Sequence, residues 1–131
     1  MIKRLFASTS LALALGAMPI AAIAQAWTPG SEIVGQSIQV TTNGVTNTVH
    51  FDPGGYARII TPGGKTVNAS WTANATELCL NSGAGAECWP YTQAFQAGQS
   101  VTLTSNCNAT STWVANGVNP PPRVENMSER G

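Results

Sequence analysis

Few residues of this chain are of the types that carry out chemistry, and His50 and Asp52 form the clearest pair. They are the only histidine and the only aspartate of the 131-residue sequence, and they lie two positions apart before a Pro-Gly-Gly turn. Such a pair could act as general base and acid. A polar histidine at the end of a strand, followed by an Asp-Pro-Gly turn, is the favoured alternative. No serine lies in the motif of an activated nucleophile.

A second pair of candidate catalytic groups is Glu77 and Glu87, which flank a central hairpin. Two carboxylates on either side of a sugar could hydrolyse a glycoside. Two solvated glutamates at strand ends are the favoured interpretation. We therefore predict no catalytic residue, no cofactor and no metal site, and a protein that is not an enzyme.

Two of the three cysteines, Cys79 and Cys88, lie in this hairpin, within residues 67–91. If they oppose each other in an antiparallel pair, Leu78 opposes Trp89, since opposed residues share a face. The apolar side chains then occupy one face and both sulfurs the other. The spacing does not fit a redox pair, which needs two residues between its cysteines. A structural disulfide is favoured over a redox or metal-binding role.

Cys107 is left without a partner in this scheme. An unpaired, partly buried thiol is favoured. Pairing between molecules and a different bridge to one of the other cysteines are the alternatives.

Aromatic residues are the candidates for binding contacts. Trp71 and Trp89 share the parity of the aliphatic residues and are expected in the core. Trp27, Tyr56 and Trp113 are the candidate contact residues, since the mouths of barrels bind ligands between aromatic walls. The expected partner is a small ligand or an envelope protein.

The N-terminus has the pattern of a secretory signal peptide. Lys3 and Arg4 precede an apolar stretch over 11–24, and Ala24-Gln25-Ala26 is a cleavage site of small residues. The stretch is short for a membrane span. We expect a signal helix over 1–26, cleaved after Ala26 or Ala24, contact with the membrane only during export, and a periplasmic or secreted protein.

The remaining chain of about 105 residues carries four positive and six negative side chains, a net charge of about −2. It has no basic patch, which excludes nucleic acid as an expected partner. Its length suits a single domain, predicted over 27–118 and expected to be monomeric. Residues 119–131 are Pro-rich and then polar, and we predict a disordered tail.

Residues 37–51 give the clearest local pattern. Two alternating runs flank Asn43-Gly44, a pair of residues that favours a two-residue type I′ hairpin turn. In this register Asn47 is the one polar residue among apolar neighbours. His50 falls on the polar face.

Further short alternating runs follow at intervals of about ten residues, separated by Gly- and Pro-rich turns. A helical turn is expected around residues 93–95. The pattern predicts an all-β protein of seven or eight strands, an antiparallel meander closed into a small barrel. A sandwich is the alternative.

The series FDPGGYARI, NASWTANATELCL, AECWPY and AGQSVTLTS, within residues 33–105, resembles a family of small exported proteobacterial proteins. That family has a G-x-W strand, then L-C, E-C-W and G-Q-S. Here Ala69-Ser70-Trp71 stands where Gly-Thr-Trp is usual, and Cys107 is an addition. The resemblance implies the fold and export, and it implies no site residue because the family has no assigned activity. The rhythm of turns and tryptophans also resembles lipocalin and avidin barrels, which implies a ligand cavity.

Overall fold

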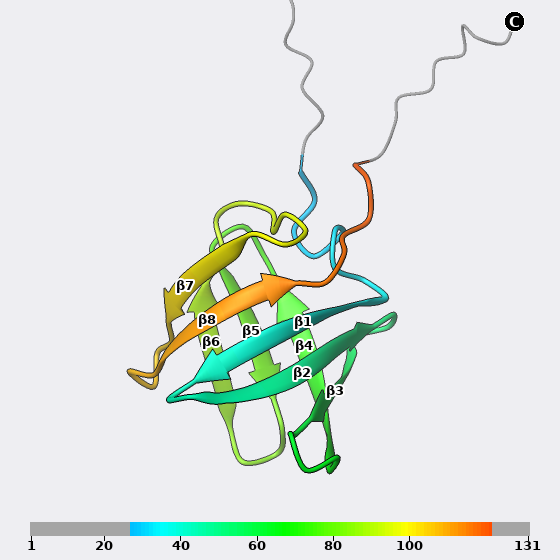
Figure 1. The fold of residues 1–131 in the computed structure, drawn as a ribbon. Helices are drawn as coiled ribbons and strands as arrows, with labels where there is room; N and C mark the ends of the chain where they lie inside the picture. Colours follow the sequence, from blue (N-terminus) through cyan, green and yellow to red (C-terminus); the bar gives the residue numbers. More distant parts are fainter. Residues whose placement is uncertain (1–26, 122–131) are drawn as a thin grey trace, which may run out of the picture.

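The computed structural model describes residues 27–121, so the expected signal peptide and residues 122–131 of the expected tail lie outside it. The described chain is all-β, with eight strands and no helix (Figure 1). It therefore has no helix long and apolar enough to cross a membrane. The strands are β1 (Gln36–Thr42), β2 (Val45–Asp52), β3 (Tyr56–Ile60), β4 (Thr66–Ala73), β5 (Glu77–Asn81), β6 (Ala86–Pro90), β7 (Ser100–Thr104) and β8 (Thr110–Ala115).

The strands form one antiparallel sheet in the order β6-β5-β4-β3-β2-β1-β8-β7. Every pair joins neighbours along the sequence except β1–β8, which places the last hairpin beside the first strand. The sheet curls until its two edge strands, β6 and β7, approach each other (Figure 1). The predicted small antiparallel barrel is confirmed, in a nearly closed form.

The seam between β6 and β7 is joined by side-chain and loop contacts rather than by a ladder. The Cys88 N–H donates to Asn106 Oδ1 at 3.0 Å, and the Asn106 N–H donates to the Cys88 carbonyl at 2.9 Å. The next residue of β6 with the same orientation is Pro90, which has no N–H to donate. The seam therefore lacks one donor at the next ladder position, which favours incomplete closure of the barrel.

The two-residue turn between β1 and β2 has the predicted conformation. Asn43 and Gly44 have φ angles of 51° and 79°, and both central residues of a type I′ turn need positive φ. The resulting register pairs Val40 with Asn47. The amide of Asn47 therefore lies on the inner face of the barrel, where the alternation placed it.

The barrel has two different ends (Figure 1). We call the first the open end: it carries the turns and loops 43–44, 61–65, 82–85 and 105–109. We call the second the plugged end: residues 27–35 and the crossing 91–99 lie there. The chain enters β1 and leaves β8 at the plugged end, so both ends of the described chain lie on this side.

Two expectations about loops are wrong. Residues 93–95 form no helical turn, because Phe95 is buried and its N–H is bound by the carboxylate of Glu32. Asn119, expected in the tail, belongs to the domain: its amide donates to the Ser31 and Val34 carbonyls at 3.0 and 2.8 Å.

The central hairpin has the predicted register and disulfide. Cys79 opposes Cys88, and Leu78 opposes Trp89, with both of the latter buried. The N–H and carbonyl of Cys88 point to the seam, so the cysteines form a non-hydrogen-bonded pair, in which strands bring Cα atoms closest. Their Cα atoms are 4.0 Å apart. A disulfide is consistent with an oxidising compartment.

We expect the double substitution Cys79→Ser and Cys88→Ser to lower the free energy of unfolding by about 2.5–3 kcal/mol, because the bridge closes a loop of about ten residues in the unfolded chain. Urea unfolding followed by tryptophan emission measures the loss. Cys107→Ser is the matched control, since this thiol is exposed and unpaired. Equal stability of the double variant and the control would show that the bridge is dispensable.

Candidate functional site

The barrel interior is hollow at the open end. A cavity of about 200 Å³ has a largely apolar wall, formed by Val40, Val49, Ile59, Leu80, Trp89, Ala109 and Trp113. The polar side chains in its wall are Thr42, Asn47, Glu87 and Ser111. A cavity of roughly 150 Å³ is enough for one benzene ring, so this volume suits a molecule of about ring size. An apolar wall with few polar groups is typical of small-molecule sites.

The hollow exists because small or polar side chains occupy inward positions near the open end. Asn47 lies where an aliphatic residue would continue the apolar face of β2. The hydroxyls of Thr42 and Ser111 satisfy each other across the β1–β8 pair at 2.6 Å. Deeper in the barrel, the fully buried Phe51 and Ile38 fill the interior. The barrel interior is therefore filled around Phe51 and Ile38 and hollow near the open end.

The cavity continues towards the loops of the open end. A second hollow, of about 320 Å³, borders loop residues Ser82 and Gly85 and the side chain of Cys107. It shares four wall residues with the cavity, namely Ile59, Leu80, Glu87 and Trp89. The two hollows are therefore adjacent at the open end of the barrel.

Glu87 is the one charged residue of the cavity wall. Its carboxylate accepts a hydrogen bond from Ser105 Oγ at 2.6 Å. The sequence-based interpretation of Glu87 as a solvated strand-end residue is wrong, because Glu87 pairs with the inward-facing Leu80 and is half-buried. The wall is therefore electrostatically negative, which disfavours an anionic ligand.

Two tryptophans of the cavity wall have indole N–H groups without an acceptor. Trp89 is 5% exposed and Trp113 0%, and neither ring nitrogen has a hydrogen-bond partner among the described residues. The other two indoles are paired: Trp27 donates to Glu32 Oε1 at 3.1 Å and Trp71 to the Asp52 carbonyl at 3.0 Å. Buried donors are nearly always bonded in native proteins, so two unpaired ones beside one cavity are unusual.

The plugged end is closed around the buried carboxylate of Glu32. Glu32 Oε2 accepts from the Tyr91 hydroxyl at 2.7 Å and from the Phe95 N–H at 2.9 Å. The Tyr91 oxygen in turn accepts from the Gly30 N–H at 2.9 Å. Burial, together with the hydrogen bond to Glu32, raises the pKa of Tyr91 far above its ordinary value. These bonds tie the N-terminal segment to the crossing that follows β6.

A further hollow, of about 340 Å³, lies outside this plug between Trp27, Phe95, Val118 and Pro120. Trp27, a predicted contact residue, lines it. The ring of Trp27 is half-buried and packs edge-on against Tyr91 at 5.0 Å between centroids. Trp27 therefore helps to hold the plug as well as border this hollow.

The other two predicted contact residues, Tyr56 and Trp113, differ in their exposure to solvent. Tyr56 is 67% exposed at the start of β3. Trp113 is fully buried, so it is no surface contact; it packs against Trp89 in the cavity wall, with centroids 4.9 Å apart. Cys107 is exposed rather than partly buried, because it sits at the tip of the β7–β8 loop.

The structure does not join the pairs considered for catalysis. Arg58 binds Asp52 through two hydrogen bonds, of 2.7 and 3.0 Å. The hydrogen bonding to Arg58 is the main reason why the pKa of Asp52 is lowered, and the nearby His50 lowers this pKa less. Glu77 and Glu87 lie on opposite faces of the sheet, the first exposed outside and the second inside. They cannot flank one substrate.

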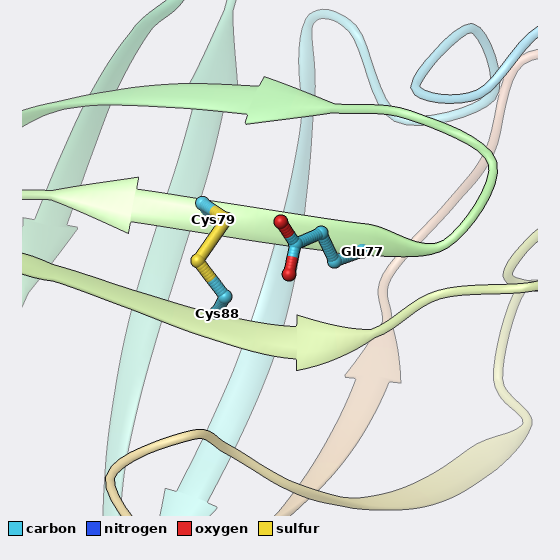
Figure 2. Close-up of side chains that lie close together, drawn as sticks. All are labelled: Glu77, Cys79 and Cys88. Carbon is cyan, nitrogen blue, oxygen red and sulfur yellow. A yellow bond between two sulfur atoms is a disulfide. The ribbon is translucent and has the colours of Figure 1, made fainter.

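Figure 2 shows Glu77 beside the disulfide, the one group of potential metal ligands that the described residues bring together. Their ligand atoms lie within 4.8 Å of one another. Both sulfurs are bonded to each other, however, and thiolates rather than disulfides bind metals. The donor set therefore does not suit a metal ion while the disulfide is intact.

Sequence reasoning missed several residues that shape the two ends. Glu32 and Ser105 gave no signal, because Tyr91, which binds Glu32, and Glu87, which binds Ser105, lie 59 and 18 residues away in the chain. Asn47 gave a signal, as a polar misfit in an apolar alternation. Glu87 also gave one, since it shares the parity of the buried Trp89.

Comparison of the chain with models of protein families, with characterised proteins and with solved structures gives no match. The resemblance to a family of exported proteins stays a prediction. The fold and the cavity define the molecule as a small antiparallel barrel that is plugged at one end and hollow at the other.

We expect Tyr91→Phe to lower the free energy of unfolding by about 1–3 kcal/mol at neutral pH, since Gly30 N–H and Glu32 each lose a partner. The pH dependence should change as well. Above pH about 10 an unfolded tyrosine loses its proton, whereas buried Tyr91 keeps it, so stability falls as pH rises. Urea unfolding between about pH 8 and 11 should show a weaker fall in Tyr91→Phe than in wild type. Tyr56→Phe, at an exposed position, is the control; an identical fall in Tyr91→Phe and wild type would contradict the expectation.

Proposed function

We propose that this protein is an exported, non-catalytic binding module that holds a small molecule in the cavity at the open end of its barrel. The cavity carries the proposal: about 200 Å³ remain unfilled where the barrel meets solvent, beneath a rim of loops. A protein selected only for stability would fill such a space, since each buried methylene contributes about 0.8 kcal/mol.

The wall composition also favours binding over packing. Asn47 places an amide, with one donor group and one acceptor, among apolar neighbours. Export is supported by the charged and apolar N-terminal sequence and by the disulfide. The periplasm or the extracellular space is therefore the proposed place of action.

An envelope protein that contacts another protein through Trp27 is the alternative, and it has less support. The Trp27 indole N–H is bonded to Glu32, and its ring packs on Tyr91. Much of this side chain is thus occupied within the domain.

Asn47→Leu tests the proposal. Leucine extends apolar surface into the cavity, so we expect the variant to be more stable than wild type by about 1 kcal/mol and to lose binding. Isopropylbenzene serves as a probe of ring size, and its binding is followed by the emission of Trp89 and Trp113, which line the cavity. Stability is measured by urea unfolding.

Asn68→Leu is the matched control, the same substitution on the exposed face of β4. It should bind the probe as wild type does. Equal binding of the probe to wild type and Asn47→Leu would refute a ligand site in this cavity.

A further inference from the structure

The two unpaired indole N–H groups are the most specific chemical feature of the cavity. Trp89 and Trp113 come from β6 and β8, and their rings meet edge to face, 68° apart in plane. Both border the same space. Each buried donor without a partner destabilises the fold, because the desolvation of its N–H group is not offset by a hydrogen bond. A ligand that supplied an acceptor would remove this penalty only when bound.

We propose that the cavity recognises an uncharged molecule of ring size that carries a hydrogen-bond acceptor, such as a carbonyl oxygen, and that the indole N–H groups of Trp89 and Trp113 are its donors. This inference rests on the proposed function of the cavity, and it adds the chemical class of the ligand. A carbonyl oxygen has two lone pairs and can accept from two donors.

The burial of the two ring nitrogens limits how an acceptor can reach them. Neither nitrogen contacts the water-accessible space of the cavity in the structure, so an acceptor reaches them only if the two rings shift as the ligand enters. The apolar part of the ligand then lies against Val49, Ile59 and Leu80.

The charge of the wall selects against anions. Glu87 is the one ionisable group in the wall, and it lies beside Trp89 in β6. The described chain has two cationic side chains, Arg58 and Lys65, and neither belongs to the wall. A carboxylate ligand would therefore meet a like charge without a cation to offset it.

Four molecules with the same number of non-hydrogen atoms separate these requirements. Isopropylbenzene has the size alone, acetophenone adds an acceptor, benzamide adds an acceptor and donors, and benzoate adds a negative charge. We expect acetophenone and benzamide to bind measurably, and benzoate at least about tenfold more weakly than either.

Indole NMR on the disulfide-bonded chain reads the contacts directly. The four tryptophans give four indole N–H signals, and two of them, from Trp27 and Trp71, belong to groups that are already bonded. Acetophenone should move the Trp89 and Trp113 protons downfield, as hydrogen bonding does, and leave the other two in place. Isopropylbenzene should produce no downfield movement. A downfield shift of either proton supports the inference and assigns the donor.

Substitutions test the energetic role. Trp89→Phe and Trp113→Phe keep an aromatic ring and remove the N–H. Each should lower the affinity for acetophenone relative to isopropylbenzene by about fivefold, close to the value of one hydrogen bond. Trp71→Phe is the matched control, because its N–H is bonded outside the cavity. Should the first two variants fail to fold, the titration of the wild-type chain still decides the question.

Glu87→Gln, with Glu77→Gln on the outer face as its control, should raise the affinity for benzoate by about threefold or more. The inference is wrong if acetophenone leaves both indole protons in place, or if neither phenylalanine variant changes the affinity ratio. Indole protons that resonate far upfield and do not move would show that these N–H groups already interact with the face of the neighbouring aromatic ring. The proposed function survives these results if isopropylbenzene binds and Asn47→Leu abolishes that binding. It fails if none of the four molecules binds.

Discussion

The buried carboxylate of Glu32 is the group on which the closure of this barrel depends. It is 6% exposed and accepts hydrogen bonds from Trp27, Tyr91 and the backbone of Phe95. A buried charge is tolerated only when its hydrogen-bonding capacity is satisfied, and bonds to a charged acceptor are stronger than neutral ones. This requirement draws the N-terminal segment and the crossing after β6 over the same end of the barrel, and so closes the end opposite the cavity.

A column of stacked aromatic residues connects the plugged end to the interior of the barrel. Tyr91 stacks on Phe95, and Phe95 stacks on Trp113, with centroids 5.5 and 5.7 Å apart. The column fixes the position of Trp113, and Trp89 packs edge-on against it. The plug therefore orients the floor of the cavity. The open end is held separately, by the Thr42–Ser111 and Glu87–Ser105 hydrogen bonds, and keeps small or polar side chains where packing would prefer larger ones.

Sequence reasoning predicted what is local and missed what the closure brings together. Alternation, Asn43-Gly44 and the cysteine spacing determine hairpin register, because opposed residues of a hairpin are close in the chain. The β1–β8 pairing and the bonds of Glu32 to Tyr91 and Phe95 join residues that are separated by 59 or more positions, and no local pattern encodes them. The cavity was predicted in part from the local sequence. Asn47 was predicted on the inner face because it interrupts an apolar alternation. Glu87 has the parity of the buried Trp89, but it was interpreted as solvated, since alternation alone does not show that a charged residue lines a cavity.

The contacts at the seam attach the two edge strands to each other and leave the cavity at the open end in place. Cys88 is bonded covalently to β5 and through its backbone to Asn106, and Asn106 follows Ser105, which holds Glu87. One short loop thus fastens the two edge strands and positions the only charge of the cavity wall. The two hydrogen bonds of the Cys88 backbone across the seam join Cys88 to Asn106, in the loop of the open end, beside the cavity. Access then depends on the loops around Gly85 and Cys107, while the strands that form the wall stay paired.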